Sequence, residues 1–452
     1  MGKLFGTDGV RGVANSELTP LMAYKIGKIT AHILSQQKGS RAKILIGMDT
    51  RISGTMLGAA FSAGACSSGA DVINLGVIPT PAVAFLVREL KGDAGVVVSA
   101  SHNPMHDNGI KILDSKGFKI SMAFENEIEE FVLSDEDDSL PVLTGADVGR
   151  IIEDYEAINS YISYMAQIFK DIDLSGIKIA IDCAQGATYQ AAPAILKKLG
   201  ANLQIIHGEP NGTNINKDCG STHLDAIKKF VVENKMDVGI AFDGDGDRVL
   251  MVSCDGNEVD GDQIMSICAH YMKEQGTLSK DMLVITVMSN MGLNIMAEEN
   301  GIKLERTAVG DKYVLEKMVE EGAALGGEQS GHIIFLEHNT TGDGILTALN
   351  VLNIMHKKSA SLKEVNTKMK VMPQVVVGAK VSNDKKRDFD KEPIIKDAIA
   401  ALDKEYAGRG RILVRASGTE PLVRIMIEGE DLEKMTKEAN ELKLLMEKHL
   451  GA

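Results

Sequence analysis

Short apolar runs alternate with stretches of helical periodicity along nearly the whole chain. The apolar runs are KILIGMD (43–49), DVINLGV (71–77), AGVVVSA (94–100), IKIAIDC (177–183) and MLVITVM (282–288). Helical patterns lie beside them, for example over 188–199 and 292–299. Short, fully apolar strands separated by helices are typical of buried, largely parallel sheets. The pattern therefore predicts successive α/β domains.

Three changes in this pattern predict domain boundaries. An acidic stretch over 135–149 precedes a helical pattern over 152–170, a turn near 254–260 separates a strand from a helix, and near 368–374 a helix gives way to a strand. We therefore expect domains over 1–150, 151–255, 256–370 and 371–452. The last one reads as a strand, a helix (385–406), a strand pair (411–428) and a final helix (431–449), which is an α+β pattern.

Composition narrows the range of functions. At 452 residues the chain is too long for one hydrophobic core. Its formal net charge of −14 repels polyanions over most of the surface, so a phosphorylated substrate would need a local basic pocket. Aromatic residues make up only 4% and Trp is absent, which argues against a nucleic-acid partner bound by base stacking.

The cysteines and the apolar runs indicate the compartment. The five cysteines are scattered and form no CxxC pair, which favours reduced thiols over a disulfide framework or a zinc site. No apolar run approaches the roughly 20 residues that span a bilayer. The first residues, MGKLFG, lack the apolar core of a signal peptide. We expect a cytoplasmic protein with no membrane partner.

The first candidate loop, SASHNPMHDNGIK (99–111), follows the carboxyl end of an apolar strand. Ligands of open α/β sheets bind at such ends. Ser101 is a candidate nucleophile, and Lys111 can return to the same site as an acid, a base or a charge. A plain Asn-Pro turn with a helix cap is the alternative. No G-x-S-x-G pattern surrounds Ser101, so the loop is not a nucleophile elbow.

The second loop, FDGDGDRV (242–249), presents Asp243, Asp245 and Asp247 at alternate positions, separated by single glycines. Carboxylates this close repel one another unless a cation neutralises them. Hard oxygen ligands of this kind suit Mg²⁺, which keeps open positions for a phosphate oxygen. An EF-hand is excluded, because Arg248 and Cys254 stand where that motif needs Gly and Glu. A plain acidic turn is the remaining alternative.

The third loop, GGEQSGH (326–332), precedes another apolar strand. Its Glu328, Gln329 and Ser330 offer a carboxylate, an amide and a hydroxyl, which together can bind neighbouring sugar hydroxyls. A glycine-rich hairpin with polar tips explains the same residues.

The fourth loop, RASGTEP (415–421), lies between two apolar strands, with Arg424 on the second. Arginines, hydroxyls and exposed backbone N–H groups form an anion site suited to phosphate. This is the local basic site that the acidic composition requires. A hairpin with surface arginines is the alternative.

The ordered set of loops resembles the α-D-phosphohexomutase superfamily over essentially the whole chain. The matching segments are FGTDGVRG (5–12), GMDTRISG (47–54), PTPA (79–82), SASHNP (99–104), DGDGDR (243–248), GEQSGH (327–332) and RASGTEP (415–421). The resemblance implies three consecutive α/β domains with mixed sheets plus a smaller C-terminal α+β domain, with the active-site cleft between the four.

The resemblance also implies roles for the residues of the loops. Ser101 is expected to carry a phosphoryl group, and one Mg²⁺ per active site is expected on Asp243, Asp245, Asp247 and the phosphoserine. Arg11, Lys111 and Arg248 are expected beside the transferring phosphate and His332 near the reacting end. Lys111, and after it His332, is the expected general acid or base. The expected sugar ligands are Glu328, Gln329 and Ser330, and the expected ligands of the non-reacting phosphate are Arg415, Ser417, Gly418, Thr419 and Arg424.

The reaction expected from the resemblance is an intramolecular phosphoryl transfer in two half-reactions. Phospho-Ser101 gives its group to the free hydroxyl of a phosphosugar, and the other phosphate of the 1,6-bisphosphorylated intermediate returns to Ser101. Glucosamine or glucose 1,6-bisphosphate is expected as activator, and a priming kinase or autophosphorylation as the source of the first phosphate. A homodimer is also expected.

Several segments point to the branch of the superfamily that interconverts glucosamine 6-phosphate and glucosamine 1-phosphate for amino-sugar nucleotide and cell-wall precursor synthesis. They are GEQSGH, FGTDGVRG, GTNINKDCGSTH (212–223) and TAVGDKYV (307–314). In the last, Asp311 follows Gly310 where hexose enzymes usually carry His. An acidic residue near the sugar favours a protonated 2-amino group. The alternatives are a mutase of neutral hexose phosphates, a Mg²⁺-dependent phosphatase and a Ca²⁺-binding scaffold.

Overall fold

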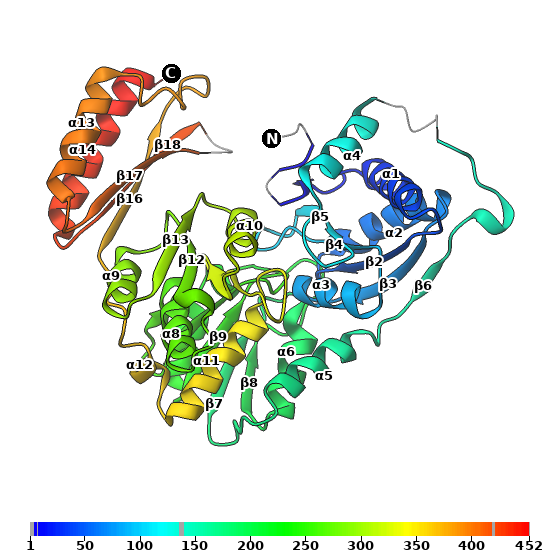
Figure 1. Cartoon of the computed structure of the whole chain (residues 1–452), viewed down its shortest axis with the longest axis horizontal. Coiled ribbons are helices and arrows are strands. Elements are labelled where there is room, and N and C mark those ends of the chain that lie inside the picture. Colours follow the sequence, from blue (N-terminus) through cyan, green and yellow to red (C-terminus); the bar gives the residue numbers. More distant parts are fainter. Residues whose placement is uncertain (1–3, 7, 135–139, 418–420, 452) are drawn as a thin grey trace. The chain divides into compact units, whose positions relative to one another are not determined.

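The computed structural model describes residues 4–6, 8–134, 140–417 and 421–451 (Figure 1). The chain divides into two compact units. The N-terminal unit comprises Met1–Met288 and Gly301–Lys368, and the C-terminal unit comprises Ser289–Asn300 and Met369–Ala452. Within the described part of the chain, no helix is both long enough and apolar enough to cross a membrane.

The first sheet of the N-terminal unit has six strands in the order β1-β5-β4-β2-β3-β6. β6, β3, β2 and β4 run parallel, whereas β5 is antiparallel to both β4 and β1. The strands are β1 (Val10–Val13), β2 (Lys43–Met48), β3 (Asp71–Val77), β4 (Ala94–Val98), β5 (Asp107–Asp114) and β6 (Ile151–Glu153). The helices of this region are α1 (Pro20–Lys38), α2 (Ile52–Ser67), α3 (Thr80–Glu89) and α4 (Met122–Ser134).

The second sheet has five strands in the order β11-β10-β9-β7-β8 and is also mixed. β8, β7 and β9 are parallel, and β10 is antiparallel to both β9 and β11. The strands are β7 (Lys178–Asp182), β8 (Asn202–Ile206), β9 (Val238–Phe242), β10 (Val249–Ser253) and β11 (Glu258–Val259). The helices are α5 (Ile158–Ile168), α6 (Thr188–Lys198) and α7 (Asp225–Glu233).

The third sheet has four strands in the order β13-β12-β14-β15, of which only β15 runs antiparallel to its neighbour. The strands are β12 (Met282–Thr286), β13 (Lys303–Thr307), β14 (Leu325–Gly327) and β15 (Ile333–Phe335). The helices are α8 (Gly261–Glu274), α10 (Asp311–Glu321), α11 (Gly344–Lys358) and α12 (Leu362–Val365).

Central strands of these sheets are the apolar runs recognised in the sequence. β4, β9 and β12 are buried along their whole length, so both faces of each strand need apolar side chains. The predicted helix over 152–170 is wrong at its start, because α5 begins at Ile158 and residues 151–153 form β6, which pairs with β3 and forms the edge of the sheet. The first and second sheets each take in one short edge strand beyond the expected boundaries at 150 and 255.

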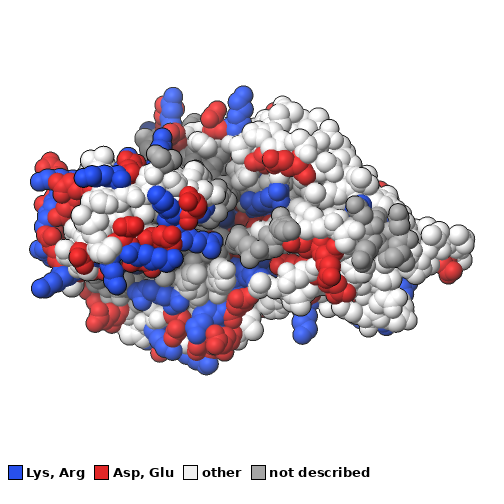
Figure 2. All heavy atoms as spheres, turned by 90° about the horizontal axis from the view of Figure 1, so that it is seen from above, with Lys and Arg blue, Asp and Glu red and all other residues white. Residues whose placement is uncertain are grey.

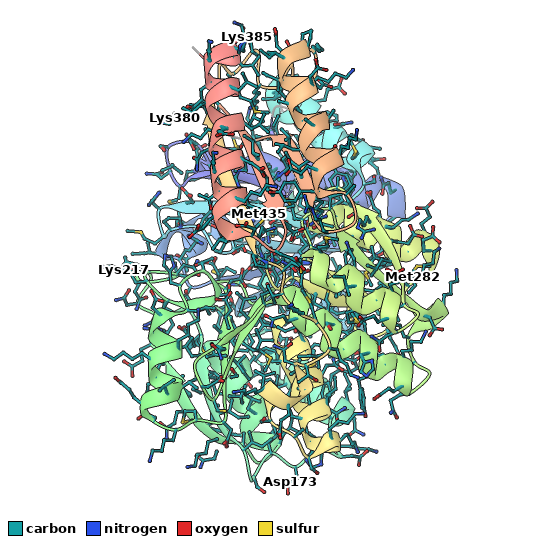
Figure 3. The ribbon with its side chains drawn as sticks, turned by 90° about the vertical axis from the view of Figure 1, so that its left-hand side faces the viewer. Asp173, Lys217, Met282, Lys380, Lys385 and Met435 are labelled. Carbon is teal, nitrogen blue, oxygen red and sulfur yellow. The ribbon has the colours of Figure 1, made fainter. Side chains whose placement is uncertain are left out.

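The C-terminal unit is smaller and has an antiparallel three-stranded sheet in the order β16-β18-β17. Helices α13 and α14 lie side by side against it, with Met435 in the first turn of α14 (Figures 1 and 3). The elements are α9 (Met291–Glu299), β16 (Gln374–Lys380), α13 (Pro393–Tyr406), β17 (Arg411–Ala416), β18 (Leu422–Glu428) and α14 (Leu432–Leu450). Three α/β sheets followed by a smaller α+β unit confirm the predicted fold class.

The helix predicted over 385–406 is shorter than expected. α13 begins at Pro393, and residues 382–392 form turns that include Lys385 and Asp388. Proline has no backbone N–H and clashes with the preceding helical turn, so a helix starts at this residue more readily than it continues through it.

The beginning of α9 is tied to the rest of the C-terminal unit by polar contacts. The Asn290 amide donates to the Met372 carbonyl at 3.0 Å and its oxygen accepts the Met372 N–H at 3.0 Å. The guanidinium of Arg411 binds the buried carboxylate of Glu428 and donates to the Ser289 carbonyl at 2.6 Å. These contacts explain why a short helix between two strands of the third sheet groups with the C-terminal residues.

Charged side chains on the C-terminal helices are interspersed in sign. On the face seen in Figure 2, basic and acidic side chains lie next to one another at the left of the view, where α13 and α14 lie. Pairs such as Lys434 with Glu438 and Lys437 with Glu441 follow the i, i+4 spacing of a solvent-exposed helix face.

A buried cluster joins segments from three parts of the N-terminal unit. Asp343, the N-cap of α11, accepts the Tyr161 hydroxyl at 2.9 Å and the Asn339 amide at 3.1 Å. The same Asn339 amide donates to the Pro81 carbonyl at 3.0 Å, at the start of α3. Burial raises the pKa of Asp343 to about 6, against the lowering effect of its hydrogen bonds.

We predict that Asp343 makes the protein less stable as the pH rises. Since its pKa is higher in the folded than in the unfolded state, the folded state binds more protons between about pH 4 and 6, and stability falls through this window by at most about 3 kcal/mol. Asp343→Asn should flatten this slope, as measured by the midpoint of thermal unfolding at several pH values. Asp431→Asn, at the exposed N-cap of α14, is the matched control. An unchanged slope in Asp343→Asn would contradict the prediction.

Candidate active site

Ser101 lies directly after β4, at the carboxyl edge of the first sheet, as the sequence predicts. It is 1% exposed and its backbone is left-handed, with φ of 51°. Its hydroxyl donates to Asp243 Oδ2 at 2.7 Å, and its N–H donates to Ser99 Oγ at 2.9 Å. A non-glycine residue in the left-handed region is strained, so the surrounding contacts must hold the hydroxyl in this position.

Arg51 supplies most of these contacts. Its guanidinium is fully buried, pairs with Asp49 at 2.9 Å, and donates to the carbonyl of Ser101 at 3.0 Å and that of Asn103 at 2.8 Å. It also donates to two further carbonyls of the same loop, those of Pro104 and Asp107. The Arg51 side chain thus fixes the backbone of the loop from Ser101 to Asp107.

The three carboxylates of the second loop converge next to Ser101. One oxygen from each of Asp243, Asp245 and Asp247 lies within 4.8 Å of the others, and all three residues are buried. A Cβ at Gly244 would come within 2.6 Å of the Ser101 carbonyl, and Gly246 has φ of 74°. The glycines between the aspartates therefore permit this close approach and this turn.

Burial and mutual repulsion dominate the electrostatics of the triad. Burial raises the pKa of Asp243 well above its ordinary value, and Asp247 and Asp245 raise it further. Burial and Asp245 raise the pKa of Asp247. Burial also opposes ionisation of Asp245, but Lys111 and the Thr80 hydroxyl bring its pKa below the ordinary value. The cluster therefore holds more negative charge than its protein neighbours neutralise.

The triad fits a divalent cation. Asp245 Oδ1 and Asp247 Oδ1 are buried and have no hydrogen-bond partner among the described residues. Buried oxygens without a partner cost free energy, which a cation would recover. Together with an oxygen on Ser101 they form a set of hard ligands of the kind that Mg²⁺ prefers.

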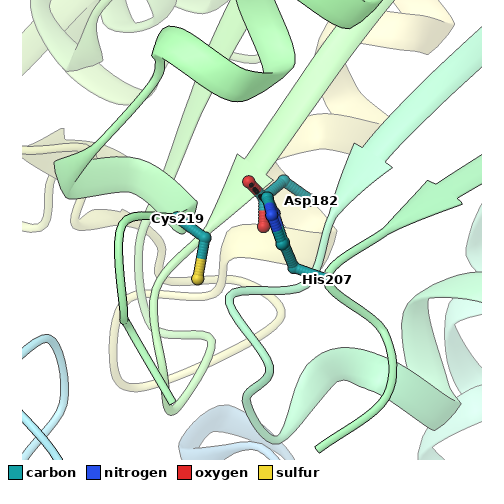
Figure 4. Close-up of side chains that lie close together, drawn as sticks. All are labelled: Asp182, His207 and Cys219. Atoms are coloured by element: carbon teal, nitrogen blue, oxygen red, sulfur yellow. Dashed lines mark hydrogen bonds and ion pairs between the residues drawn. The ribbon is translucent and has the colours of Figure 1, made fainter. Parts of the chain in front are cut away.

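A second cluster with metal-type ligands has no comparable free oxygens (Figure 4). Asp182 accepts the His207 imidazole at 2.9 Å, the Gly220 N–H at 3.0 Å and the Ala184 N–H at 2.8 Å. Burial raises the pKa of the Cys219 thiol to about 12, so it stays protonated. This cluster anchors the loop that carries Asn216.

Asn216 connects that loop to the first one. Its amide donates to the carbonyls of Ser101 at 2.8 Å and Asn103 at 3.0 Å. The GTNINKDCGSTH segment, which the sequence links to one branch of the superfamily, thus supports the backbone around Ser101.

Cations surround the position beside Ser101. Lys111 Nζ lies 3.0 Å from Asp8, 3.1 Å from Asp245 and 3.6 Å from Asp247. Burial alone would lower the pKa of Lys111, but these three carboxylates raise it above its ordinary value. Arg11, on β1 opposite Gly109 of β5, also binds Asp8. Lys111 therefore returns to the Ser101 site, as predicted, and does so as an ammonium.

His102 reports the positive potential at this place. Burial lowers the pKa of His102 to about 4, and Arg248 and Arg11 lower it further. Arg248 Nε lies 3.8 Å from Asp247 Oδ1. Cations that disfavour a protonated imidazole favour an anion in the same position, so a phosphoryl group on Ser101 would enter a favourable field.

The third loop lies against the second. The backbone of His332 pairs with that of Arg248 across a β-bridge, which brings the imidazole near the carboxylates. His332 Nε2 accepts the Gly342 N–H at 3.1 Å, which leaves the proton on the buried Nδ1. Glu328 Oε1 accepts the Gly310 N–H at 3.0 Å and so positions the loop that leads to Asp311.

The predicted sugar ligands of this loop do not all face the same way. The Gln329 amide donates to Asp260 Oδ2 at 3.1 Å, beside the N-terminus of α8. Ser330 is exposed at the tip of the hairpin between β14 and β15. The structure thus brings Glu328 and His332 to the site, whereas Gln329 supports a helix cap.

Asp311 is the first residue of α10 and belongs to an ion-pair chain that includes a residue outside every motif. Lys119 Nζ lies 2.6 Å from Asp311 Oδ2 and 2.6 Å from Asp8 Oδ1. His332 Nε2 lies 3.6 Å from the same Asp311 oxygen. Asp311 therefore stands at one end of a chain of alternating charges that reaches Lys111 and the carboxylate triad.

The fourth loop belongs to the C-terminal unit. Arg415 and Arg424 occupy facing positions on the antiparallel strands β17 and β18. Burial lowers the pKa of Arg415, and Arg424 lowers it further. Two like charges at facing positions favour a bound anion. Ser417 is buried beside them, whereas Gly418 and Thr419 lie outside the described residues.

Four residues of the site have no role that the sequence reveals. They are Asp8, Arg51, Lys119 and Asn216. Three of them lie within segments that resemble the superfamily, but most of their partners are backbone carbonyls or charges far away in sequence. Only the folded chain shows these partners.

Comparisons with known proteins agree along the whole chain. Four domain profiles of phosphoglucomutase/phosphomannomutase match it: the alpha/beta/alpha domains I, II and III at residues 2–139, 159–256 and 260–372, and the C-terminal domain at 377–445. The chain is 52% identical over 451 residues to "Phosphoglucosamine mutase" of Acetivibrio thermocellus, covering 100% of both chains.

Solved structures share the fold at low identity. A phosphoglucomutase/phosphomannomutase family protein from Burkholderia thailandensis superposes with a TM-score of 0.81 at 22% identity, covering 99% of this chain and 98% of that one. Aspergillus fumigatus N-acetylphosphoglucosamine mutase, in complex with GlcNAc-6P and magnesium, gives a TM-score of 0.70 at 19% identity, covering 98% and 95%.

We predict that Arg51 is required for stability. Arg51→Met leaves the buried Asp49 carboxylate without its counter-charge and takes one donor from each of four loop carbonyls, so the free energy of unfolding should fall by about 3–5 kcal/mol. Arg41→Met is the matched control, because Arg41 also binds an aspartate and two carbonyls but is 37% exposed. It should lose at most about 1 kcal/mol. Similar losses in chemical denaturation would refute this account of Arg51.

We predict that Mg²⁺ stabilises the protein through the triad. Mg²⁺ should raise the thermal unfolding midpoint of the wild type, and Asp247→Asn should abolish most of that increase by weakening the affinity at least about tenfold. Without metal, the variant should be as stable as the wild type or more so, because one repelling charge is gone. Asp281→Asn, at an exposed position, serves as control. An undiminished Mg²⁺ effect in Asp247→Asn would exclude the triad as the binding site.

Proposed function

We propose, because the chain belongs to the phosphoglucomutase/phosphomannomutase family, that it interconverts glucosamine 6-phosphate and glucosamine 1-phosphate. The superfamily resemblance noted in the sequence is confirmed by these matches. The glucosamine assignment is supported by the full-length identity to a phosphoglucosamine mutase and by Asp311 beside the site. The product would supply amino-sugar nucleotide and cell-wall precursor synthesis.

The observation that carries the proposed chemistry is the position of Ser101. Its hydroxyl is held on Asp243 within the carboxylate triad and beside Lys111, His102 and Arg248. In the first half-reaction, a phosphoryl group on Ser101 passes to the free hydroxyl of the phosphosugar. In the second, the other phosphate of the bisphosphate returns to Ser101.

The residues around Ser101 would divide the work of this transfer. Arg11, Lys111 and Arg248 would bind the equatorial oxygens of the transferring group. Mg²⁺ on the triad, when bound, would spread the developing negative charge. Lys111 is the first candidate for proton transfer, but its raised pKa keeps it an ammonium, which argues against a base role and suits it to binding phosphoryl oxygens. His332 remains the second candidate for proton transfer.

The binding of the sugar is proposed from the same arrangement. Glu328 and Ser330 would accept sugar hydroxyls, with Gln329 fixing the hairpin against Asp260. Asp311 would face the charged 2-amino group. Arg415, Ser417, Gly418, Thr419 and Arg424 would hold the non-reacting phosphate.

The remaining parts of the proposal concern activation and assembly. We expect glucosamine or glucose 1,6-bisphosphate to activate the enzyme, and a kinase or autophosphorylation to prime Ser101. We also expect a homodimer that acts in the cytoplasm, where its five free cysteines would stay reduced. The four-domain division over 1–150, 151–255, 256–370 and 371–452 stays a prediction.

We predict a strong preference for glucosamine 6-phosphate over glucose 1-phosphate and mannose 1-phosphate in Mg²⁺ with a trace of sugar bisphosphate. Ser101→Ala should lose at least about three orders of magnitude of kcat, since alanine has no hydroxyl to carry the phosphoryl group. Ser115→Ala, an exposed serine on the turn after β5, is the control. Isomerised product and released inorganic phosphate are measured together.

Each other outcome selects an alternative. Equal or better turnover of glucose or mannose phosphate would assign the chain to the mutases of neutral hexose phosphates. Release of inorganic phosphate without isomerisation would indicate a phosphatase. Full activity of Ser101→Ala would refute the phosphoserine mechanism.

A further inference from the structure

Lys119 occupies a position that no motif predicts. It follows the turn after β5, where its backbone pairs with Leu113 across a β-bridge. The Thr340 hydroxyl donates to the Gly117 carbonyl of the same turn at 2.6 Å, and Gly117 has φ of 82°. The turn is thus held by two separate parts of the N-terminal unit, which fixes the direction of the Lys119 side chain.

The ammonium of Lys119 bridges two carboxylates. It lies 2.6 Å from both Asp8 Oδ1 and Asp311 Oδ2, and its side chain is only 17% exposed. The other oxygen of Asp8 contacts Lys111 and Arg11. Asp8 therefore has three cationic partners, whereas Asp311 contacts one lysine and, at 3.6 Å, the imidazole of His332.

Asp311 retains capacity for a further donor. A carboxylate has about four acceptor positions. One oxygen of Asp311 accepts the Lys312 N–H at 2.8 Å, and the other accepts Lys119. A small pocket next to the third loop is lined by Lys119 and Asp311 together with His332, Thr340 and Thr341. The Asp311 side chain is 19% exposed, so a donor on the substrate can reach its carboxylate.

The charge state of Asp311 depends on Lys119. Burial opposes its ionisation, yet Lys119 more than offsets this, so the pKa of Asp311 lies below its ordinary value although Asp8 raises it. Without the lysine, two partly buried carboxylates would face each other, and one would tend to take up a proton or turn away. A neutral carboxyl binds an ammonium much less strongly than a carboxylate does.

We propose that Lys119 is a positioning residue for substrate selection, which keeps Asp311 an oriented carboxylate that accepts the charged 2-amino group of the sugar. This rests on the proposed function. The substrate ammonium would give Asp311 a second cationic partner beside Lys119. A neutral hexose phosphate supplies no such partner, which disfavours it.

The test compares glucosamine 6-phosphate with glucose 6-phosphate in Lys119→Gln, Lys119→Arg and the control Lys116→Gln. Lys116 lies on the same turn but is exposed. Lys119→Gln should raise the KM for glucosamine 6-phosphate roughly tenfold or more, with a much smaller change for glucose 6-phosphate, because the contact is made in the ground state as well as in the transition state. Lys119→Arg should restore most of the preference, and Lys116→Gln should keep it.

An equal loss for both sugars in Lys119→Gln would overturn the inference and make the lysine a general structural residue. If Lys119→Gln does not fold, Asp311→Asn is measured instead. It should lose the preference for the amino sugar, and retention of the wild-type preference would overturn the inference. A wild type that prefers glucose 6-phosphate would refute the proposed substrate itself, before any variant is compared.

Discussion

Three carboxylates buried within contact of one another form the constraint on which the site depends. Asp243, Asp245 and Asp247 repel one another, and two of their oxygens have no partner among the described residues. The protein tolerates this cost by placing Lys111 and Arg248 beside them and by leaving room for a cation. The Ser101 hydroxyl binds Asp243 of this triad, and the cations that lower the pKa of His102 lie beside it. The groups needed for phosphoryl transfer are therefore in place before the substrate binds.

Much of the site could be predicted from sequence, because its chemistry is carried by residues that are close together along the chain. The spacing of the aspartates and the position of Ser101 after an apolar strand are local patterns. Arg51 and Asn216 are different, since their partners are backbone carbonyls that become neighbours only after folding. The role of Lys119 is harder still to predict, because its turn has no motif and its two carboxylate partners, Asp8 and Asp311, are distant in sequence.

In the fold, too, the parts set by local sequence could be predicted and the parts set by tertiary contacts could not. Central strands such as β4 and β9 are buried on both faces, so their apolar runs identify them without further information. Edges and ends depend on tertiary pairing. The helical pattern after residue 151 yields to β6 because β3 offers an open edge, and the helix expected from residue 385 starts only at Pro393. These are the positions where local preference is weak and neighbouring elements decide.

The grouping of α9 with the C-terminal unit means that the chain passes between the two units three times, near residues 288, 300 and 368. A fragment cut after residue 370 would keep α9 but lose its partners Met372, Arg411 and Glu428. The C-terminal unit is therefore not an independent module that can be removed or exchanged at a single boundary. A chimaera between relatives would have to exchange residues 289–300, which include α9, together with residues 369–452.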